Sequence, residues 1–397
     1  MEADKDEKNT IVSGSSALAV WRTPPIVRAL LSPSIADVEL PLSSRELNNV
    51  RSAAHRELAV WRNNAFLGRR GRPVIAERAL DVLDSIVCLA PSVTLPVEVL
   101  VPAPADRRRS DLLVSRVLDP VLVRAHSQRL TRTLLVASPE LTLLTLAPRL
   151  SLERLVMVAA ELCGSFTVFR MTEALRDAIE RMERERVLPR MGSWVPSLDR
   201  NGRLTDLWAR PPLTTPGRIA SLAREAKGKR GRDKLHRAAE LVRSGAASPF
   251  EVRAGMLLGL PPELGGEGYG GFEHNVEVRL SPTAMRLARR RTCRCDLFWG
   301  ASDGWRALDL ECQSFEWHAG GERGLSDSDR TTALQSMDIE VLLATWGQFA
   351  TVSRFDALSQ TVAEKIGHEP PARTPEFLAA RAHLRHEVLT SWDALLS

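Results

Sequence analysis

Three acidic residues between positions 248 and 349 have the types and the order that could hold a divalent metal ion. Glu251 lies at the start of a predicted helix, Asp296 lies in a predicted strand over 292–299, and Glu311 lies in the next predicted strand, over 306–313. Carboxylate oxygens are the ligands that magnesium and manganese prefer. The chemistry indicated is metal-assisted hydrolysis, provided that the fold brings the three side chains together.

The two predicted strands place their acidic residues on polar faces that can meet. Because side chains alternate along a strand, Asp296 falls on the face of Arg294, and Glu311 falls on the face of Asp309 and Gln313. A short ASDG turn between the strands predicts a hairpin. Two carboxylates so close repel each other unless a cation lies between them. We therefore expect Asp296 and Glu311 to bind Mg²⁺ or Mn²⁺.

Glu251 has a second interpretation. The run Ser248-Pro249-Phe250-Glu251 opens a helix that is predicted to end near Leu260, and a serine followed three residues later by a glutamate is typical of a capping box. A carboxylate in the first turn can also face outward into a site. The structural role and the metal-binding role of Glu251 therefore both stay open.

Cysteines near the acidic residues raise the alternative of zinc. Cys293, Cys295 and Cys312 lie on the two predicted strands, with His318 close behind. Their spacing is not the CxxC type that marks a zinc knuckle. Because the thiols alternate away from the acidic face, we expect them in an apolar layer beneath helices.

A glycine-rich segment over 259–278, GLPPELGGEGYGGFEHNVEV, separates the first helix from strand 292–299. No predicted strand precedes its glycines and no helix begins on them, so they do not form a dinucleotide-binding fingerprint. We expect a mobile loop at the rim of the site, placed to contact DNA.

In their order, these residues resemble the PD-(D/E)xK nuclease superfamily, in particular the group similar to very-short-patch-repair endonucleases. The pattern is a helix Glu, an Asp in a strand, an acidic second strand, a His, a helix with D-x-x-R and a final buried strand. This chain matches it with Glu251, Asp296, Glu311, His318, Asp327 with Arg330, and 339–345. The FEWH run that ends at His318 is similar to the Phe-Trp-His of the mismatch-repair members. The resemblance covers about residues 246–360.

The resemblance implies a restriction-endonuclease-like α/β domain with a mixed central sheet flanked by helices. It implies a metal-dependent DNA endonuclease in bacterial defence or DNA repair, in which Asp296 and Glu311 hold Mg²⁺ and Glu251 assists. His318 is then the general base, and Arg330 stabilises the charge that develops on the phosphate.

Gln313 departs from the family pattern, which has a lysine two residues after the second acid. A glutamine can neither activate water nor neutralise a developing charge as lysine does. The alternative is therefore a DNA-binding or regulatory protein that keeps the fold without cleavage. Arg330 and Asp327 lie one helical turn apart, so a simple pair between them is also open.

The first half of the chain predicts a separate α+β domain. Strands are expected over 96–101, 112–117 and 132–136, followed by a helix capped by Ser138 and a longer helix over 152–163. This pattern weakly resembles the region found beside antitoxin-type regulators of abortive-infection systems. That resemblance implies a toxin-antitoxin or defence-system partner.

The α+β chain is therefore predicted to contain several domains in succession, with the candidate catalytic residues in the domain over 246–365. The C-terminal helix is expected to pack back on the chain or to form a homodimer contact. The parts are a disordered tail over 1–10, the N-terminal domain over 11–182, a basic linker with two helices over 183–245, the endonuclease-like domain over 246–365 and the helix over 366–397.

Charge favours a nucleic-acid partner. The 397 residues carry a net charge of +5. Of the 54 basic residues, six are lysine and the other 48 are arginine. Much of the arginine content is typical of genomic base composition, and a solvated turn is an equal interpretation of any one cluster. Guanidinium groups nonetheless pair bidentately with phosphate oxygens. The residues expected to contact DNA are Lys227, Lys229, Arg230, Arg232, Arg289 and Arg290.

Composition narrows the class of protein further. No stretch approaches about 20 uninterrupted apolar residues, which disfavours a membrane span. The charged start MEADKDEKNT lacks the apolar core of a secretory signal, and the five cysteines show no disulfide framework. We expect a protein of the reducing cytoplasm.

Overall fold

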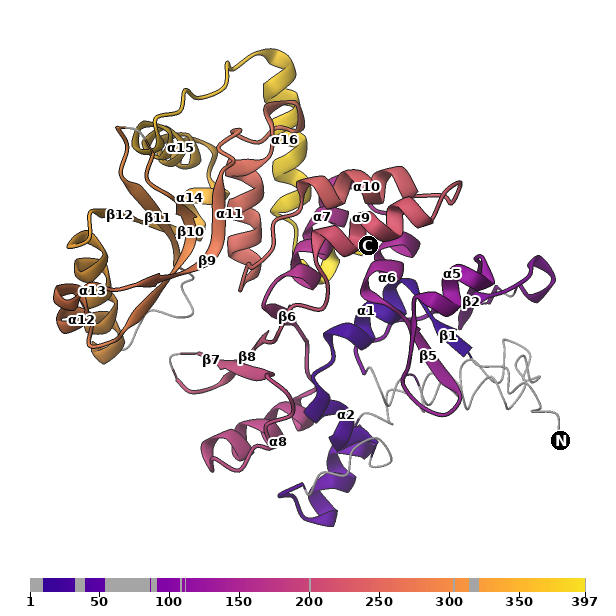
Figure 1. Ribbon diagram of the computed structural model, residues 1–397. Helices are drawn as coiled ribbons and strands as arrows, with labels where there is room; N and C mark the ends of the chain where they lie inside the picture. Colours follow the sequence, from indigo (N-terminus) through magenta and orange to yellow (C-terminus); the bar gives the residue numbers. More distant parts are fainter. Residues whose placement is uncertain are drawn as a thin grey trace.

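The computed structural model describes residues 10–32, 40–53, 86, 91–107, 109–110, 112–199, 201–302, 304–313 and 321–396, and for 321–327 only the course of the backbone. These residues form an α+β protein with three sheets. The largest apolar core is continuous from Val12 to Leu395. Figure 1 shows the C-terminal sheet on one side of the molecule and the N-terminal sheet on the other, with helices between them. The expected tail over 1–10 is wrong at Thr10, which begins a strand, and its other residues lie outside the described ones. The helical spacing of apolar residues also predicts a helix over 73–88, which lies outside the described residues apart from Ile86.

The N-terminal sheet has the strand order β3-β2-β1-β5-β4. Its centre joins distant parts of the sequence, because β1 pairs antiparallel with β2 and parallel with β5. The predicted strands in this half are confirmed, as is the Ser138 cap, whose hydroxyl accepts a hydrogen bond from Leu141 N. The elements are β1 (Thr10–Val12), α1 (Gly14–Arg22), β2 (Val97–Val101), β3 (Leu113–Val117), α5 (Pro120–Ala125), β4 (Ser127–Arg129), β5 (Leu134–Ala137) and α6 (Pro139–Leu146).

The segment predicted as a linker is folded instead. Two of its stretches, β7 and β8, join the earlier strand β6 in an antiparallel sheet with the order β6-β8-β7. Trp208 of β8 is buried in a small core against helices α2 and α8. Its Arg- and Pro-rich composition concealed these strands. The elements are α2 (Pro25–Leu31), β6 (Phe166–Val168), α8 (Glu173–Arg184), β7 (Val195–Leu198) and β8 (Leu204–Ala209).

Three further helices form the layer between the sheets. Helix α7 begins and ends at the predicted residues, and α10 packs against both α7 and α9. The two helices predicted within 183–245 are confirmed as α9 and α10. The helices are α7 (Leu152–Cys163), α9 (Pro216–Glu225) and α10 (Arg232–Leu241).

The C-terminal sheet has the order β12-β11-β10-β9 and is mixed, as predicted. Strands β9, β10 and β11 run antiparallel, whereas β12 lies parallel to β11 after the crossover helix α13. The expected loop over 259–278 is wrong from Phe272 onward, because the apolar alternation after the last glycine forms β9. The elements are β9 (Phe272–Arg279), β10 (Thr292–Trp299), β11 (Ala307–Gln313), α13 (Gly321–Gln335) and β12 (Ile339–Thr345).

Helices cover both faces of this sheet (Figure 1). Helices α12 and α13 enclose a small core on one face, and the large core lies on the other, with α11, α14 and α15. The last helix, α16, packs back on the chain, where Arg253 donates to the carbonyl oxygens of Val388 and Thr390. These helices are α11 (Pro249–Gly259), α12 (Pro282–Ala288), α14 (Trp346–Ala350), α15 (Val352–Ile366) and α16 (Pro375–Val388).

The described part of the chain contains no helix with both the length and the apolar character needed to cross a bilayer.

Candidate metal-binding and active site

The regular alternation of side chains along β9 and β10 is interrupted at Asn275 and Asp296. These two residues lie between the regular Cα pairs Cys295–Val276 and Leu297–His274. Before this point Cys295 packs toward α12 and α13, and after it Leu297 packs in the core on the α11 side. Strict alternation would put both side chains on one face. Asn275 has a φ of +52°, which asparagine tolerates better than most residues. The kink takes Asp296 out of the regular alternation.

Asp296 lies next to the last regular Cα pair between β10 and β11. The Cα pairing of these strands runs from Trp299 and Leu308 to Leu297 and Leu310. At the next position Oδ2 of Asp296 accepts a hydrogen bond from the backbone N–H of Cys312 at 2.8 Å. The carboxylate is therefore held beside β11 by the backbone.

Helix α11 supplies Glu251, whose side chain is 5% exposed. Of the predicted capping box, the serine half is present, because the Ser248 hydroxyl accepts a hydrogen bond from the Glu251 N–H at 3.2 Å, whereas the Glu251 carboxylate bonds to neighbours other than the Ser248 N–H. The Glu251 carboxylate accepts hydrogen bonds from Ala247 N at 2.7 Å and from Asn275 Nδ2 at 2.5 Å. Glu251 thus supports the helix start and faces the sheet. Asn275 is a site residue that the sequence prediction missed.

Arg330 of α13 provides a positive charge on the other side of the cluster. Its guanidinium contacts the Glu311 carboxylate and the Arg294 carbonyl oxygen, and lies 3.9 Å from Oδ2 of Asp309. Asp309 is fully buried, and neither of its carboxyl oxygens accepts a hydrogen bond of ordinary geometry from the described residues. Glu311 and the thiol of Cys295 lie against it. The positive charge of Arg330 therefore partly offsets the negative charges of two buried acids, Asp309 and Glu311.

Burial raises the pKa of all three predicted ligands, and a neighbouring acid adds to the effect in each case. The pKa of Glu251 rises to about 8 because the group is buried and lies near Asp296. The pKa of Asp296 rises to about 7 through burial and the charge of Glu311, and that of Glu311 to about 9 through burial and the neighbouring Asp309. Near neutral pH the cluster keeps protons that a bound cation would displace.

The donor set has the chemistry of a site for a hard divalent cation. Glu251, Asp296 and Glu311 offer oxygen atoms alone, which suits Mg²⁺ or Mn²⁺ better than zinc. Among the residues that the structure describes, no three acidic, His or Cys side chains are grouped closely enough to hold a metal as they are placed. Arg330 lies on Glu311, so a cation would have to share or replace this contact.

The cysteines do not occupy the positions predicted for them. Cys293 and Cys295 pack toward α12 and α13, on the side of Glu311, whereas Cys312 packs against the core on the α11 side. The prediction that all three thiols turn away from the acids is therefore wrong, because the alternation is interrupted at Asp296. Thiols on opposite faces do not support a zinc site.

Of the remaining predicted catalytic residues, the structure describes Gln313 and Arg330 but not His318. Gln313 ends β11, paired with Thr345 of β12, and is partly buried. His318 and the side chain of Asp327 lie outside what the structure describes, so a pair between Asp327 and Arg330 stays a prediction. Arg330 pairs with Glu311 instead of remaining free.

The predicted DNA contacts fall into two separate places. Arg289 and Arg290 are exposed on the turn between α12 and β10, in the same domain as the acidic cluster. The basic turn between α9 and α10 points away from the C-terminal sheet (Figure 1). There Lys229 lies 3.7 Å from Asp119, Arg232 lies 2.5 Å from Asp233, and Lys227 and Arg230 are exposed.

Comparisons with protein-family models, with curated proteins and with solved structures found no match to this chain.

Proposed function

We propose that the protein is a Mg²⁺- or Mn²⁺-dependent DNA endonuclease that hydrolyses phosphodiester bonds. The observation that carries the proposal is the position of Asp296 on β10, where its charge acts on Glu251 of α11 and the charge of Glu311 on β11 acts on it. Buried acids with raised pKa values beside one positive charge, here Arg330, are an arrangement that active sites often contain.

The order of the elements supports the same proposal. Helix α11 precedes the antiparallel strands β9, β10 and β11, and α13 then crosses to the parallel strand β12. This is the mixed sheet that the resemblance to the PD-(D/E)xK superfamily implies. The acids occupy the predicted helix and strands within it.

The side chains have distinct roles in the proposed reaction. Asp296 and Glu311 hold the cation and Glu251 assists, while Asn275 and the Cys312 N–H keep two of the carboxylates in place. When bound, the cation lowers the pKa of an attacking water and polarises the phosphate. Arg330 offers the phosphate the positive charge that Gln313 does not supply. His318 keeps its proposed role as general base.

DNA is the proposed partner. Exposed Arg289 and Arg290 lie in the same domain as the cluster and suit contact with the phosphate backbone. The described cysteines, including the buried Cys163 and Cys295, are free thiols, which is consistent with a cytoplasmic role. We include in the proposal a setting in bacterial defence or DNA repair, with a homodimer or a defence-system partner.

A second function is favoured by one observation. Arg330 already compensates Glu311, and Gln313 stands where the family has lysine. A chain in which the arginine permanently takes the place of the cation would bind DNA without cutting it. This is the regulatory or repressor-like alternative.

Plasmid nicking tests the proposal. The full chain is incubated with supercoiled plasmid in Mg²⁺ or Mn²⁺, beside an EDTA control and an Asp296→Ala, Glu311→Ala double variant. Metal-dependent nicking that the double variant loses supports the endonuclease. Retained DNA binding without cleavage of double- or single-stranded substrates would support the regulatory alternative.

A further inference from the structure

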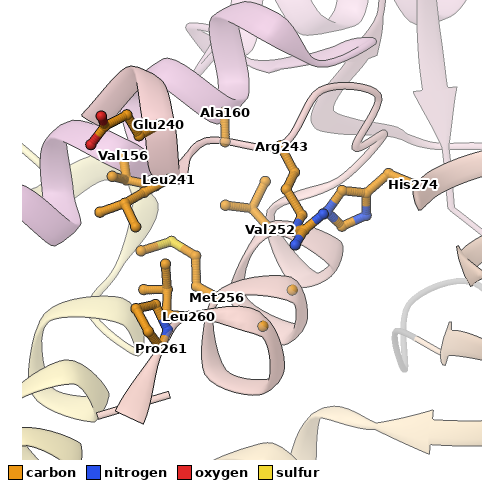
Figure 2. Close-up of a pocket in the computed structure, with 12 residues that line it drawn as sticks. Val156, Ala160, Glu240, Leu241, Arg243, Val252, Met256, Leu260, Pro261 and His274 are labelled. Atoms are coloured by element: carbon orange, nitrogen blue, oxygen red, sulfur yellow. The ribbon is translucent and has the colours of Figure 1, made fainter. Parts of the chain in front are cut away.

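A cavity of about 220 Å³ lies where the helical layer meets the C-terminal sheet (Figure 2). Its wall is formed by α7, by the end of α10 and the turn after it, by α11 and by His274 of β9. Liquid water occupies about 30 Å³ per molecule, so the cavity has room for roughly seven water molecules. A small organic ligand fits this space.

One part of the wall is apolar, and the carboxylate of Glu240 lies beside it at the end of α10. Val156 of α7 and the residues Met256 and Leu260 at the end of α11 are at most 5% exposed. Figure 2 shows Leu241, Met256 and Leu260 together on the side of the cavity away from His274. This part of the wall favours a hydrocarbon group over water.

The opposite side carries the guanidinium of Arg243, next to the imidazole of His274 (Figure 2). Arg243 lies over the Phe272 ring, with Cζ 4.6 Å from the ring centre, and donates a hydrogen bond to the Phe272 carbonyl oxygen at 3.1 Å. Among the described residues, no carboxylate oxygen lies within 4.0 Å of this guanidinium. Its charge is therefore available to a ligand, and an anion would relieve the cost of its partial burial.

His274 adds a hydrogen-bond acceptor to the same corner. Its Nδ1 lies 3.3 Å from the carbonyl oxygen of Asp296, which assigns the ring proton to Nδ1 and leaves a lone pair on Nε2. The Nε2 atom lies toward Gly255 of α11, where a Cβ would come within 2.9 Å of it. The glycine therefore lets α11 pack closely against the imidazole, whose ring lines the cavity beside this contact.

We infer that the cavity binds a small aliphatic 2-hydroxy carboxylate. The carboxylate pairs with Arg243, the hydroxyl group donates to Nε2 of His274, and the hydrocarbon tail lies on Met256 and Leu260. An inorganic anion would leave the apolar wall uncovered, and an uncharged lipid would leave the Arg243 charge unpaired.

Occupancy of the cavity would act on the candidate active site. His274 contacts the backbone of Asp296, and the next residue, Asn275, donates to Glu251 and to the carbonyl oxygen of Gly245. A bound ligand therefore alters the cation affinity of the acidic cluster. This second part rests on the proposed function, whereas binding in the cavity does not.

Isothermal titration calorimetry of the full chain with 2-hydroxyhexanoate tests the binding. We expect the uncharged analogue 1,2-hexanediol to bind about tenfold or more weakly, because it lacks the charge-assisted contact. Arg243→Gln is expected to lose affinity by a similar factor. Arg224→Gln removes an exposed arginine of α9 that does not line the cavity, and it should bind as the wild type does.

Met256→Trp provides a second variant that keeps the charge and fills the apolar side. It should abolish binding while circular dichroism shows that the fold is retained. Equal affinities for the acid and the diol, undiminished binding by both cavity variants, or no binding by the wild type would overturn the inference.

Mn²⁺ titration with and without saturating 2-hydroxyhexanoate tests the coupling. A severalfold change in the Mn²⁺ dissociation constant that Arg243→Gln loses is the expected result. An unchanged constant overturns the coupling. Absence of all Mn²⁺ binding contradicts the proposed function and leaves the calorimetric result to decide the cavity.

Discussion

The side-chain amide of Asn275 donates a hydrogen bond to the carboxylate of Glu251 at 2.5 Å and so ties strand β9 to the first turn of helix α11. The same amide donates to the carbonyl oxygen of Gly245 at 3.0 Å. Asn275 can do this because its φ of +52° turns its side chain out of the regular strand pattern. Its backbone conformation and its amide group thus serve one purpose, the placement of Glu251.

Replacing Asn275 by Gly and by Ala separates these two contributions. Glycine adopts positive φ freely, whereas alanine is expected to lose about 1–2 kcal/mol of stability in this conformation. Both variants lack the amide and are expected to lose about tenfold in metal-dependent cleavage, in line with loss of a group that orients a ligand. Chemical denaturation and nicking rates measure the two effects. Equal cleavage by wild type and Asn275→Gly would show that the amide does not position Glu251.

Asn275 also shows how far the sequence could predict this site. Alternation located β10 and β11 and predicted that Asp296 and Glu311 could interact, because the apolar pattern of each strand is strong. The interruption of the alternation along β9 and β10 depends on one backbone angle at Asn275, which no periodicity reports. The glycines before Phe272 concealed β9 itself, so the residue opposite Asp296 could not be identified.

The partner of Arg330 was equally hidden from sequence reasoning. Helical spacing favours a local pair between Asp327 and Arg330, but it says nothing of a strand that approaches across the fold. In the structure Arg330 contacts Glu311 of β11. Tertiary contacts of this kind follow from the packing of α13 on the sheet, which depends on the whole domain.

Asp296→Asn should abolish tight cation binding. The substitution keeps the size of the side chain and its ability to accept the Cys312 N–H bond, but it removes the negative charge. We expect Mn²⁺ affinity to fall by about 100-fold or more, with cleavage falling in parallel. Calorimetry and plasmid nicking measure the two. Asp329→Asn changes an exposed acid on α13 and is the matched control; an equal effect of both variants would contradict a specific role for Asp296.

The raised pKa of Glu311 predicts that stability falls as pH increases. Its folded pKa of about 9 exceeds the unfolded value of about 4.3, so folding favours the protonated carboxyl group. That contribution is complete below about pH 4 and is lost as pH rises toward 9. Without divalent cations, Glu311→Gln should gain on the order of a few kcal/mol relative to wild type between pH 5 and 9.

Urea denaturation at a series of pH values checks this difference. Glu364→Gln, which changes an exposed glutamate of α15, should follow the wild-type curve. Mg²⁺ should restore wild-type stability at pH 8 to 9, because the cation favours the ionised carboxylates. Parallel pH curves for wild type and Glu311→Gln would mean that Glu311 does not hold a proton in the folded protein.

Arg330 should compete with the metal for the acidic cluster. Its guanidinium contacts Glu311 and lies 3.9 Å from Asp309, so Arg330→Gln leaves two buried acids without their positive neighbour. Loss of one partner of a buried pair costs about 3–5 kcal/mol, although protonation of Glu311 will recover part of this. We expect a less stable protein without metal and a larger increase in melting temperature with Mn²⁺ than wild type shows.

Thermal denaturation with and without Mn²⁺ decides between the two proposed functions. Arg306→Gln, which breaks an exposed pair with Asp338, controls for the loss of an arginine. If Arg330 is displaced during the reaction, wild type binds Mn²⁺ and cuts DNA, and Arg330→Gln binds the ion more tightly but cuts more slowly because the phosphate loses a positive contact. If the arginine replaces the cation permanently, Mn²⁺ stabilises only the variant, and wild type binds DNA without cutting it. An identical Mn²⁺ response of both proteins would exclude competition at this site.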